Sequence, residues 1–399
     1  MEVRAAMPMP SILQDLPDFS LVMGGPLYQM FRRVNLSGSA LEFLWRRIMV
    51  ISLIAWLPLA ILSSIEGHIL GGRNLSFLRD IESHLRFLLA LPILIFAELF
   101  VHDRMRPVLK RLVERGVVIR EDMQKFHAAI DAGLRARNSV WLELGTALFV
   151  FTVGHWLWQH VGALGATTWY GVTDGTGIHL TPAGYWYGFV SIPIFQFILI
   201  RWYVRLAIWF QLLWRVSRLK LRLLPAHPDR AGGIGFLGKS SYAFSPIVFA
   251  QGVLLAGLIA SRVLYQGESL MSFKMSILAL VGFFALVILG PLTMFSPQLS
   301  DAKRKGLSEY GTLSTAYVAE FHEKWICGNK GEELLGTADI QSLADLGNSY
   351  AVVREMQLVP FGLSDITRMA GAAVLPVLPL LLTIMPLEEL VTRLIKMIF

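Results

Sequence analysis

The chain alternates long apolar runs with hydrophilic stretches, and seven of the runs approach the length that crosses a lipid bilayer. A transmembrane helix needs about 20 mostly apolar residues. The pattern therefore predicts an all-α fold, a polytopic transmembrane helix bundle of six or seven spans with a helical layer on the cytoplasmic side. The runs cover residues 48–64, 85–101, 139–158, 185–214, 242–265, 273–295 and 369–385.

The seventh run is the least regular. Pro376, Pro379 and Pro386 interrupt it, and proline removes a backbone donor from a helix. This run either crosses the membrane or forms a re-entrant loop that returns to the side from which it entered. The number of spans is therefore six or seven.

Two hydrophilic inserts are long enough to form helices of their own. Residues 102–138 predict two amphipathic helices, the first beginning at Pro107 and the second following Gly116. Residues 296–367 predict another pair, with the second helix over 338–356. In its first helix, apolar residues recur at steps of three or four and share one face, which either packs on a neighbouring helix or binds a partner. These residues are Leu299, Leu307, Tyr310, Leu313, Tyr317, Phe321 and Trp325.

The inserts and runs divide the chain into four parts. Residues 1–46 form a cytoplasmic amino-terminal segment, and residues 47–215 form a first membrane half that carries the insert 102–138. A Gly-rich cytoplasmic loop, 216–241, leads to a second membrane half, 242–399, which carries the insert 296–367. We expect Ser364 to cap the helix that begins the seventh run.

Lysine and arginine are distributed very unequally between the hydrophilic stretches. The stretches after the second, fourth and sixth runs are rich in both, whereas residues 161–184 contain neither. Retained positive charge marks the cytoplasmic side, so we expect the amino terminus inside and residues 161–184 outside. Aromatic residues gather at the predicted outer interface, where we expect them to form a belt: Trp169, Tyr170, Tyr185, Trp186 and Tyr187.

Composition agrees with a membrane protein and narrows its partners. Of 399 residues, 54% are hydrophobic and 16% are charged, and the formal net charge is +7. The positive charge follows the ends of apolar runs without an interleaved aromatic stripe, so we expect a lipid bilayer as partner and no nucleic acid. The one cysteine, Cys327, excludes an intrachain disulfide and a zinc site of several thiolates, and we expect neither metal nor cofactor.

Four ionisable residues inside the predicted spans are the leading candidate site. A charge within a membrane is costly and is by default a functional hypothesis. Glu98, Glu143, Arg201 and Arg205 lie at similar depth, near the predicted inner ends of the second, third and fourth runs. They form either a charged gate for an ion or anionic solute or a salt-bridged clamp, and the arginines could instead snorkel to the inner interface.

Two polar residues suggest a path farther out. His155 lies near the predicted outer end of the third run, and Gln196 lies at similar depth in the fourth. They either contribute to a proton or solute path or are hydrogen-bonded residues of the core. His155 and His160 are five residues apart, a spacing that turns their side chains to different faces of a helix and argues against a shared metal.

The loop between the fourth and fifth runs has the most distinctive hydrophilic sequence, HPDRAGGIGFLGKS. From Gly233 it matches the phosphate-binding pattern GxxxxGK[ST], but that pattern binds phosphate only between a buried strand and a helix. A basic loop before a membrane span lacks this context. We therefore expect an ordered turn in which Gly232 and Gly233 allow positive φ. An anion or lipid headgroup site at His227, Asp229 and Arg230 is the alternative.

Two stretches carry a resemblance to known sequences. HPDRAGGIGFLG, which begins at His227, and DIQSLADLGNSYAVVREM, which begins at Asp339, resemble stretches of an uncharacterised family of bacterial polytopic inner-membrane proteins. The resemblance covers most of the chain. It implies a bacterial inner membrane and no particular activity.

Two function classes follow from the sequence. The first is a channel or transporter for an ion or small anionic solute, with Glu98, Glu143, Arg201 and Arg205 as an inner gate. The second is a non-transporting scaffold or sensor that binds a cytoplasmic partner, or another copy of itself, through its helical inserts. The chain lacks GxSxG, HExxH and Asp-rich magnesium patterns, which favours a non-enzymatic protein without excluding an unfamiliar membrane enzyme.

Overall fold

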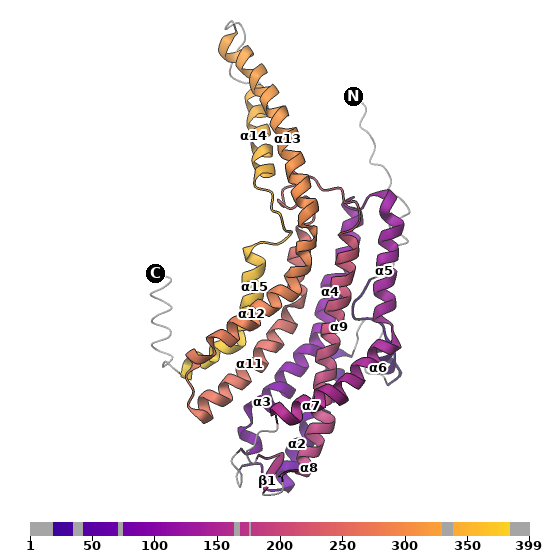
Figure 1. The fold of residues 1–399 in the computed structure, drawn as a ribbon, viewed down its shortest axis with the longest axis vertical. Coiled ribbons are helices and arrows are strands. Elements are labelled where there is room, and N and C mark those ends of the chain that lie inside the picture. Colours follow the sequence, from indigo (N-terminus) through magenta and orange to yellow (C-terminus); the bar gives the residue numbers. More distant parts are fainter. Residues whose placement is uncertain are drawn as a thin grey trace.

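The computed structural model describes residues 19–34, 43–70, 75–162, 168–174, 177–328 and 338–383. Most of these residues are helical (Figure 1). The α-helices are α1 Pro26–Arg33, α2 Leu44–Ile65, α3 Ile81–Leu85, α4 Leu91–Glu114, α5 Met123–Arg137, α6 Val140–Phe149, α7 His155–Leu157, α8 Pro182–Trp186, α9 Ile192–Val216, α10 Phe236–Ser240, α11 Ser245–Gln266, α12 Lys274–Leu289, α13 Ser296–Phe321, α14 Ala338–Arg354 and α15 Leu363–Val374. Two short antiparallel strands, β1 Gly171–Asp174 and β2 Gly177–Leu180, pair between the third and fourth spans.

Within the described residues, seven helical stretches are long and apolar enough to cross a membrane. They coincide with the seven predicted runs, so the all-α bundle is confirmed and the chain is a multi-pass membrane protein. The stretches are Leu44–Ile65, Ile81–Glu114, Val140–His160, Pro182–Val216, Phe236–Gln266, Leu270–Cys327 and Leu363–Thr383.

The seventh stretch is continuous throughout its described length. α15 passes directly into 3-10 turns over Leu375–Thr383, where Pro376 and Pro379 lie. Both parts pack along α11, where Gly252 lies against the backbone carbonyl of Ala373. The described residues therefore form one helical stretch that is long and apolar enough to cross a membrane, and Pro386 lies outside them.

Wider π-helical turns interrupt the second, third and fourth stretches. They are η3 (Arg86–Ala90), η5 (Val150–Gly154), η6 (Trp158–Gly162) and η7 (Tyr187–Ser191). Two of these turns place a glycine against a large side chain of the neighbouring helix: Gly154 against Gln196, and Gly188 against the ring of Trp158. Small residues at such contacts allow membrane helices to approach closely.

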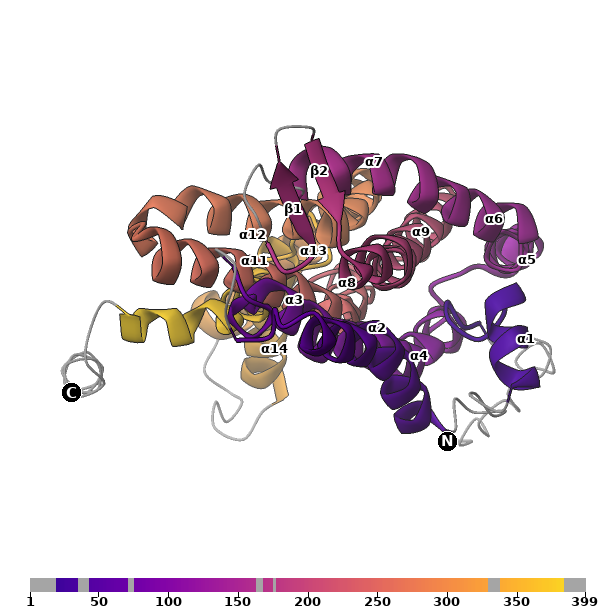
Figure 2. The same cartoon turned by 90° about the horizontal axis from the view of Figure 1, so that it is seen from below.

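Helices α4 and α9 run through the middle of the bundle (Figure 1). α4 packs against α2, α9 and α11, and α9 packs against α5 and α6. Seen from below, α11 and α12 lie at one end of the molecule and α5 and α6 at the other (Figure 2). The side chains that α4 and α9 direct at each other are therefore far from the edges of the bundle.

The first insert differs from its prediction at its start. No new helix begins at Pro107, because α4 continues through this proline to Glu114. Gly116, whose φ is 63°, follows the end of the helix. The second predicted helix is α5. Asp122 precedes it and ties it to the chain beyond α9: hydrogen bonds from the Lys125 ammonium and the Lys220 backbone N–H lower the pKa of Asp122.

The second insert projects from the bundle as a helical hairpin of α13 and α14 (Figure 1). α13 continues the sixth span, and the predicted second helix, 338–356, is observed as α14. Two residues of the predicted apolar face, Tyr317 and Trp325, donate hydrogen bonds to Asp339 of α14. Leu313 of the same face is 54% exposed. Ser364 does not cap α15: Gly362 is the residue before the helix, and its N–H donates to Asp365.

Candidate functional site

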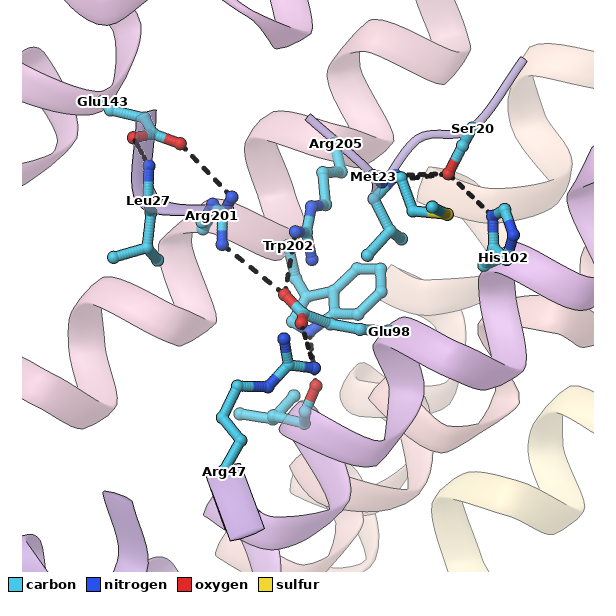
Figure 3. Close-up of polar contacts among 12 residues, drawn as sticks. Ser20, Met23, Leu27, Arg47, Glu98, His102, Glu143, Arg201, Trp202 and Arg205 are labelled. Carbon is cyan, nitrogen blue, oxygen red and sulfur yellow. Dashed lines mark hydrogen bonds and ion pairs between the residues drawn. The ribbon is translucent and has the colours of Figure 1, made fainter. Parts of the chain in front are cut away.

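A buried carboxylate, Glu98 of α4, binds three arginines from two neighbouring helices (Figure 3). Its Oε2 lies 2.7 Å from a guanidinium nitrogen of Arg47 on α2. Its Oε1 accepts a 2.8 Å hydrogen bond from Arg205 and lies 3.5 Å from Arg201, both on α9. The side chains of Arg47 and Arg205 are only 2% and 5% exposed. These charges are therefore removed from water, and Glu98 offsets only part of the positive charge of the three arginines.

A second carboxylate, Glu143 of α6, extends this ion cluster toward the third span. Its Oε1 lies 3.2 Å from Arg201, and its Oε2 accepts a 2.8 Å hydrogen bond from the backbone N–H of Leu27 in α1. That N–H belongs to the first turn of a helix, where a negative charge is favoured. Arg201 thus bridges Glu98 and Glu143, and the cluster joins α1, α2, α4, α6 and α9.

Local packing explains why the arginines of α9 point inward. Arg201 and Arg205 are four residues apart and share a face of the helix. Between them, the indole N–H of Trp202 donates to the carbonyl of Leu94 over 2.9 Å, and its ring lies 4.6 Å from the Arg205 guanidinium. This contact holds α9 against α4 and aims both arginines at Glu98.

The structure brings together all four residues selected from the sequence, but it adds a fifth that the sequence analysis missed. Arg47 stands beside Arg46 at the start of the first span, where arginines usually flank the membrane. Arg46 is exposed, whereas Arg47 is buried and faces Glu98. The sequence pattern left Arg47 just outside the predicted run 48–64, whereas in the structure α2 begins at Leu44 and takes Arg47 into its first turn.

An amino-terminal strap, residues 19–33, covers the cluster. The Ser20 hydroxyl bonds to His102 over 2.8 Å, and Arg137 donates to the Ser20 carbonyl over 2.5 Å. The hydroxyl also accepts from the backbone N–H groups of Val22 and Met23. The sequence analysis missed this strap because its contacts are made one residue at a time, without a periodic pattern.

Two small cavities border the ion cluster, and strap residues line both. The first, of about 30 Å³, lies against Leu21, Arg137, Glu143 and Arg201. The second, of about 10 Å³, is lined by residues that include Leu27, Phe31, Arg47 and Glu98. Such volumes hold at most a water molecule or two. The cluster is therefore closed to a hydrated ion in this conformation.

The predicted outer pair, His155 and Gln196, lies on neighbouring helices but is not joined by a hydrogen bond in the described structure. Gln196 donates to the Gly154 carbonyl over 3.1 Å. His155 bonds to Gln159 over 3.0 Å and packs with its ring 4.7 Å from Phe189. Their contacts favour helix packing over a shared polar path.

The loop at His227 is organised around one carboxylate. Asp229 accepts hydrogen bonds of 2.9, 3.0 and 2.9 Å from the backbone N–H groups of Ala231, Gly233 and Gly235. Gly232 and Gly233 have φ of 64° and 96°, as the turn prediction requires, and Arg230 also has a positive φ, 55°. The loop is therefore an ordered turn built on its own aspartate.

This arrangement rules out the phosphate-loop interpretation of the glycine pattern. The amides that would cradle a phosphate already donate to Asp229. Within the described residues, the regular element before the loop is helix α9 rather than a buried strand. Of the predicted anion-binding residues, Arg230 pairs with Glu355 over 3.1 Å and His227 lies 2.8 Å from Asp229. Partial burial alone would raise the pKa of Asp229, but the backbone and His227 hydrogen bonds outweigh it and lower the pKa.

Replacing Asp229 with alanine is expected to release the loop. Three backbone donors lose their acceptor, which costs about 2 kcal/mol of local stability. Hydrogen–deuterium exchange at Ala231, Gly233 and Gly235 should accelerate about 30-fold at pH 7, whereas Asp301→Ala, at an exposed ion pair, should not change it. Because the folded pKa is lowered, the stabilisation is present above pH about 4 and disappears as the pH falls through the folded pKa. Unchanged exchange at pH 7 would contradict this role.

The predicted outer aromatic belt is wrong for two of its members. Trp169 is fully buried and Tyr187 is 5% exposed, whereas Tyr185 is 57% exposed. The Trp169 indole donates to Asp80 over 2.9 Å, and the Tyr187 hydroxyl accepts from Arg86 over 2.7 Å. These rings pack inside the bundle because polar partners on the second span satisfy their N–H and hydroxyl groups.

No cluster of three or more His, Cys, Asp or Glu side chains in the described part of the chain is arranged to hold a metal ion. Comparisons with models of protein families, with curated proteins and with solved structures find no match to this chain. The function is therefore argued from the ion cluster, the strap and the surrounding cavities.

Proposed function

We propose that this membrane protein lies in a bacterial inner membrane, with its amino terminus in the cytoplasm, and carries an ion or small anionic solute across it. The ion cluster acts as the inner gate of a channel or transporter. The observation that carries the proposal is the unequal charge of the cluster, in which three guanidiniums meet two carboxylates.

The excess positive charge favours an anion. A buried charge without a counterion is expensive, and the Nε of Arg47 has no hydrogen-bond partner among the described residues. Arg137 lines the cavity beside Arg201, and among the described residues it donates to two neutral groups, the Ser20 carbonyl and Asn138. A small anion reaching this level would meet positive charge that the protein leaves uncompensated.

The strap is the part that must move for such a gate to open. Leu21 on one side and Leu27 and Phe31 on the other line the cavities next to the cluster. The strap is not a spanning helix. It is attached by hydrogen bonds at Ser20 and Leu27 and by the buried side chains of Phe19, Leu21 and Val22. Displacement of the strap would join the cavities to the cytoplasm without separating the helices.

Anion flux in proteoliposomes tests the proposal. The purified chain should give a chloride flux with anion preference, and an Arg201→Gln, Arg205→Gln variant should lower that flux on the order of 10-fold. The matched Arg201→Lys, Arg205→Lys variant keeps both charges and should retain anion preference. Circular dichroism and a thermal melt in detergent establish that each variant is folded.

The absence of flux by the folded parent across pH, voltage and several small anions would contradict transport. It would favour the second candidate, a scaffold or sensor, for which the α13–α14 hairpin provides a specific observation. None of its described residues from Leu307 to Val352 is fully buried, and Val318 and Ile340 are 51% and 45% exposed. Two helices without a buried core are suited to packing against another protein or another copy of this chain.

A further inference from the structure

A large pocket lies on the face that the loop charges predict to be cytoplasmic, away from the ion cluster. Its volume of about 1010 Å³ is at the upper end of small-molecule pockets. Three parts of the chain form it: the second half of α4, the His227 loop with α10, and the link from Gln357 to Asp365 that leads into α15. These parts lie where the second, fifth and seventh spans begin or end.

Four cations line this pocket. Arg104 and Arg111 lie seven residues apart on α4, and Arg115, four residues farther on, caps its end, so the three share one helical face. Lys239 of α10 is the fourth. None of the four pairs with a carboxylate in the described part of the chain. Like charges spaced four apart on a helix destabilise it, so Arg111 and Arg115 are better accommodated when an anion lies between them.

The four cations differ in how freely they can reach a ligand. Arg104 stacks 4.3 Å from the ring of Phe100, and Arg115 lies 4.8 Å from Phe236 and donates to the Gly233 carbonyl. The exposed side chains of Arg111 and Lys239 make no such contact within the described residues. Arg111 and Lys239 are therefore the free donors of the pocket.

Three carboxylates also line the pocket, and two of them accept hydrogen bonds from backbone N–H groups. Asp229 accepts from three backbone N–H groups, and Asp365 accepts from the Gly362 N–H over 2.9 Å. The third, Asp103, lies beside Arg104 on α4. The four cations outnumber the three carboxylates, so the pocket carries a net positive charge and favours an anionic ligand.

We propose that this pocket binds the phosphate group of an organic phosphate. The guanidinium fork of Arg111 matches two phosphate oxygens, and the Lys239 ammonium adds a point charge. Phe236, Pro360 and Phe361 supply an apolar wall for the rest of the ligand. The site uses no residue of the ion cluster, so it goes beyond the proposed transport and stands independently of it.

Titration calorimetry tests the proposal with phenyl phosphate as the soluble probe and phenol as its phosphate-free control. The protein is held in a maltoside detergent, which contains no phosphate. Native mass spectrometry of protein exposed to phosphatidic acid or to diacylglycerol tests the lipid form of the same chemistry. The parent should bind at least one phosphate probe and neither control. Retention of phosphatidic acid without binding of phenyl phosphate would identify a lipid headgroup as the source, and binding of phenyl phosphate would identify a soluble ligand.

The variant Arg111→Gln, Lys239→Gln should weaken that binding about 10-fold or more. Arg111→Lys, Lys239→Arg, which keeps both charges, should retain most of it. Lys110→Gln, which removes an exposed neighbour on α4 outside the pocket, should bind like the parent. The proposal is overturned if neither phosphate probe binds, or if the double glutamine variant binds as well as Lys110→Gln. Binding in detergent requires no transport, so this result is separate from the flux measurement.

Discussion

Replacing Glu98 with glutamine is expected to lower the free energy of unfolding by about 3–5 kcal/mol. The carboxylate contacts Arg47, Arg201 and Arg205, and a neutral amide leaves three guanidiniums facing one another with only Glu143 as counterion. Glutamine has nearly the same size, so the loss is electrostatic rather than a packing defect. Thermal unfolding in detergent micelles should show a lower midpoint than that of the parent.

Glu114→Gln is the matched control, because Glu114 lies on the same helix. Its side chain is 38% exposed and lies 3.6 Å from the exposed Lys110. Exposed pairs of this kind contribute about 0–1 kcal/mol, so this variant should melt close to the parent. Equal melting of the two glutamine variants would show that Glu98 does not hold the cluster together.

Replacing Gly252 with alanine is expected to separate two membrane helices. A methyl group on Gly252 of α11 would overlap the backbone carbonyl of Ala373 on α15 and reach Pro376. A carbonyl in a helix cannot rotate aside, so the helices must shift, which costs about 1–3 kcal/mol or more. A lower thermal midpoint and faster proteolysis near α15 should report the change.

Gly282→Ala provides the contrast on α12, another membrane helix. A methyl group there meets no atom within 4 Å, and alanine favours a helix over glycine by about 1 kcal/mol. The Gly282 variant should therefore equal or exceed the parent in stability. If Gly252→Ala behaved in the same way, α15 would not be packed against α11 as described, and the seventh span would need another position.

Sequence reasoning located the membrane helices well because one physical demand governs them. A bilayer core requires about 20 apolar residues whose backbone groups bond within the helix, and that demand is visible in each run. Glu98, Glu143, Arg201 and Arg205 were also visible, since charged residues stand out against an apolar background. Their common depth followed from the antiparallel order of the spans.

The predictions from sequence were wrong where a local pattern was compatible with two different structures. Pro107 predicted the start of a helix, but α4 continues through this proline. The backbone carbonyls that lose a hydrogen bond to the proline lie near the end of a membrane span. Trp169 and Tyr187 predicted an interfacial belt, yet Asp80 and Arg86 draw their polar groups inward. The glycines after Asp229 matched a phosphate loop until their amides were seen to donate to that carboxylate.

The sequence by itself thus determined the class of protein, the seven helices and the charged residues that need partners. Only the tertiary structure decided which partners they have: Arg47 pairs with Glu98, the Leu27 N–H with Glu143, and the cations of the pocket form no ion pair with a carboxylate of the described residues. The reason is that lipid tails are as apolar as leucine, so hydrophobicity does not specify which helices are neighbours. Close packing at glycines and the pairing of buried charges make that choice, and both depend on residues far apart in the chain.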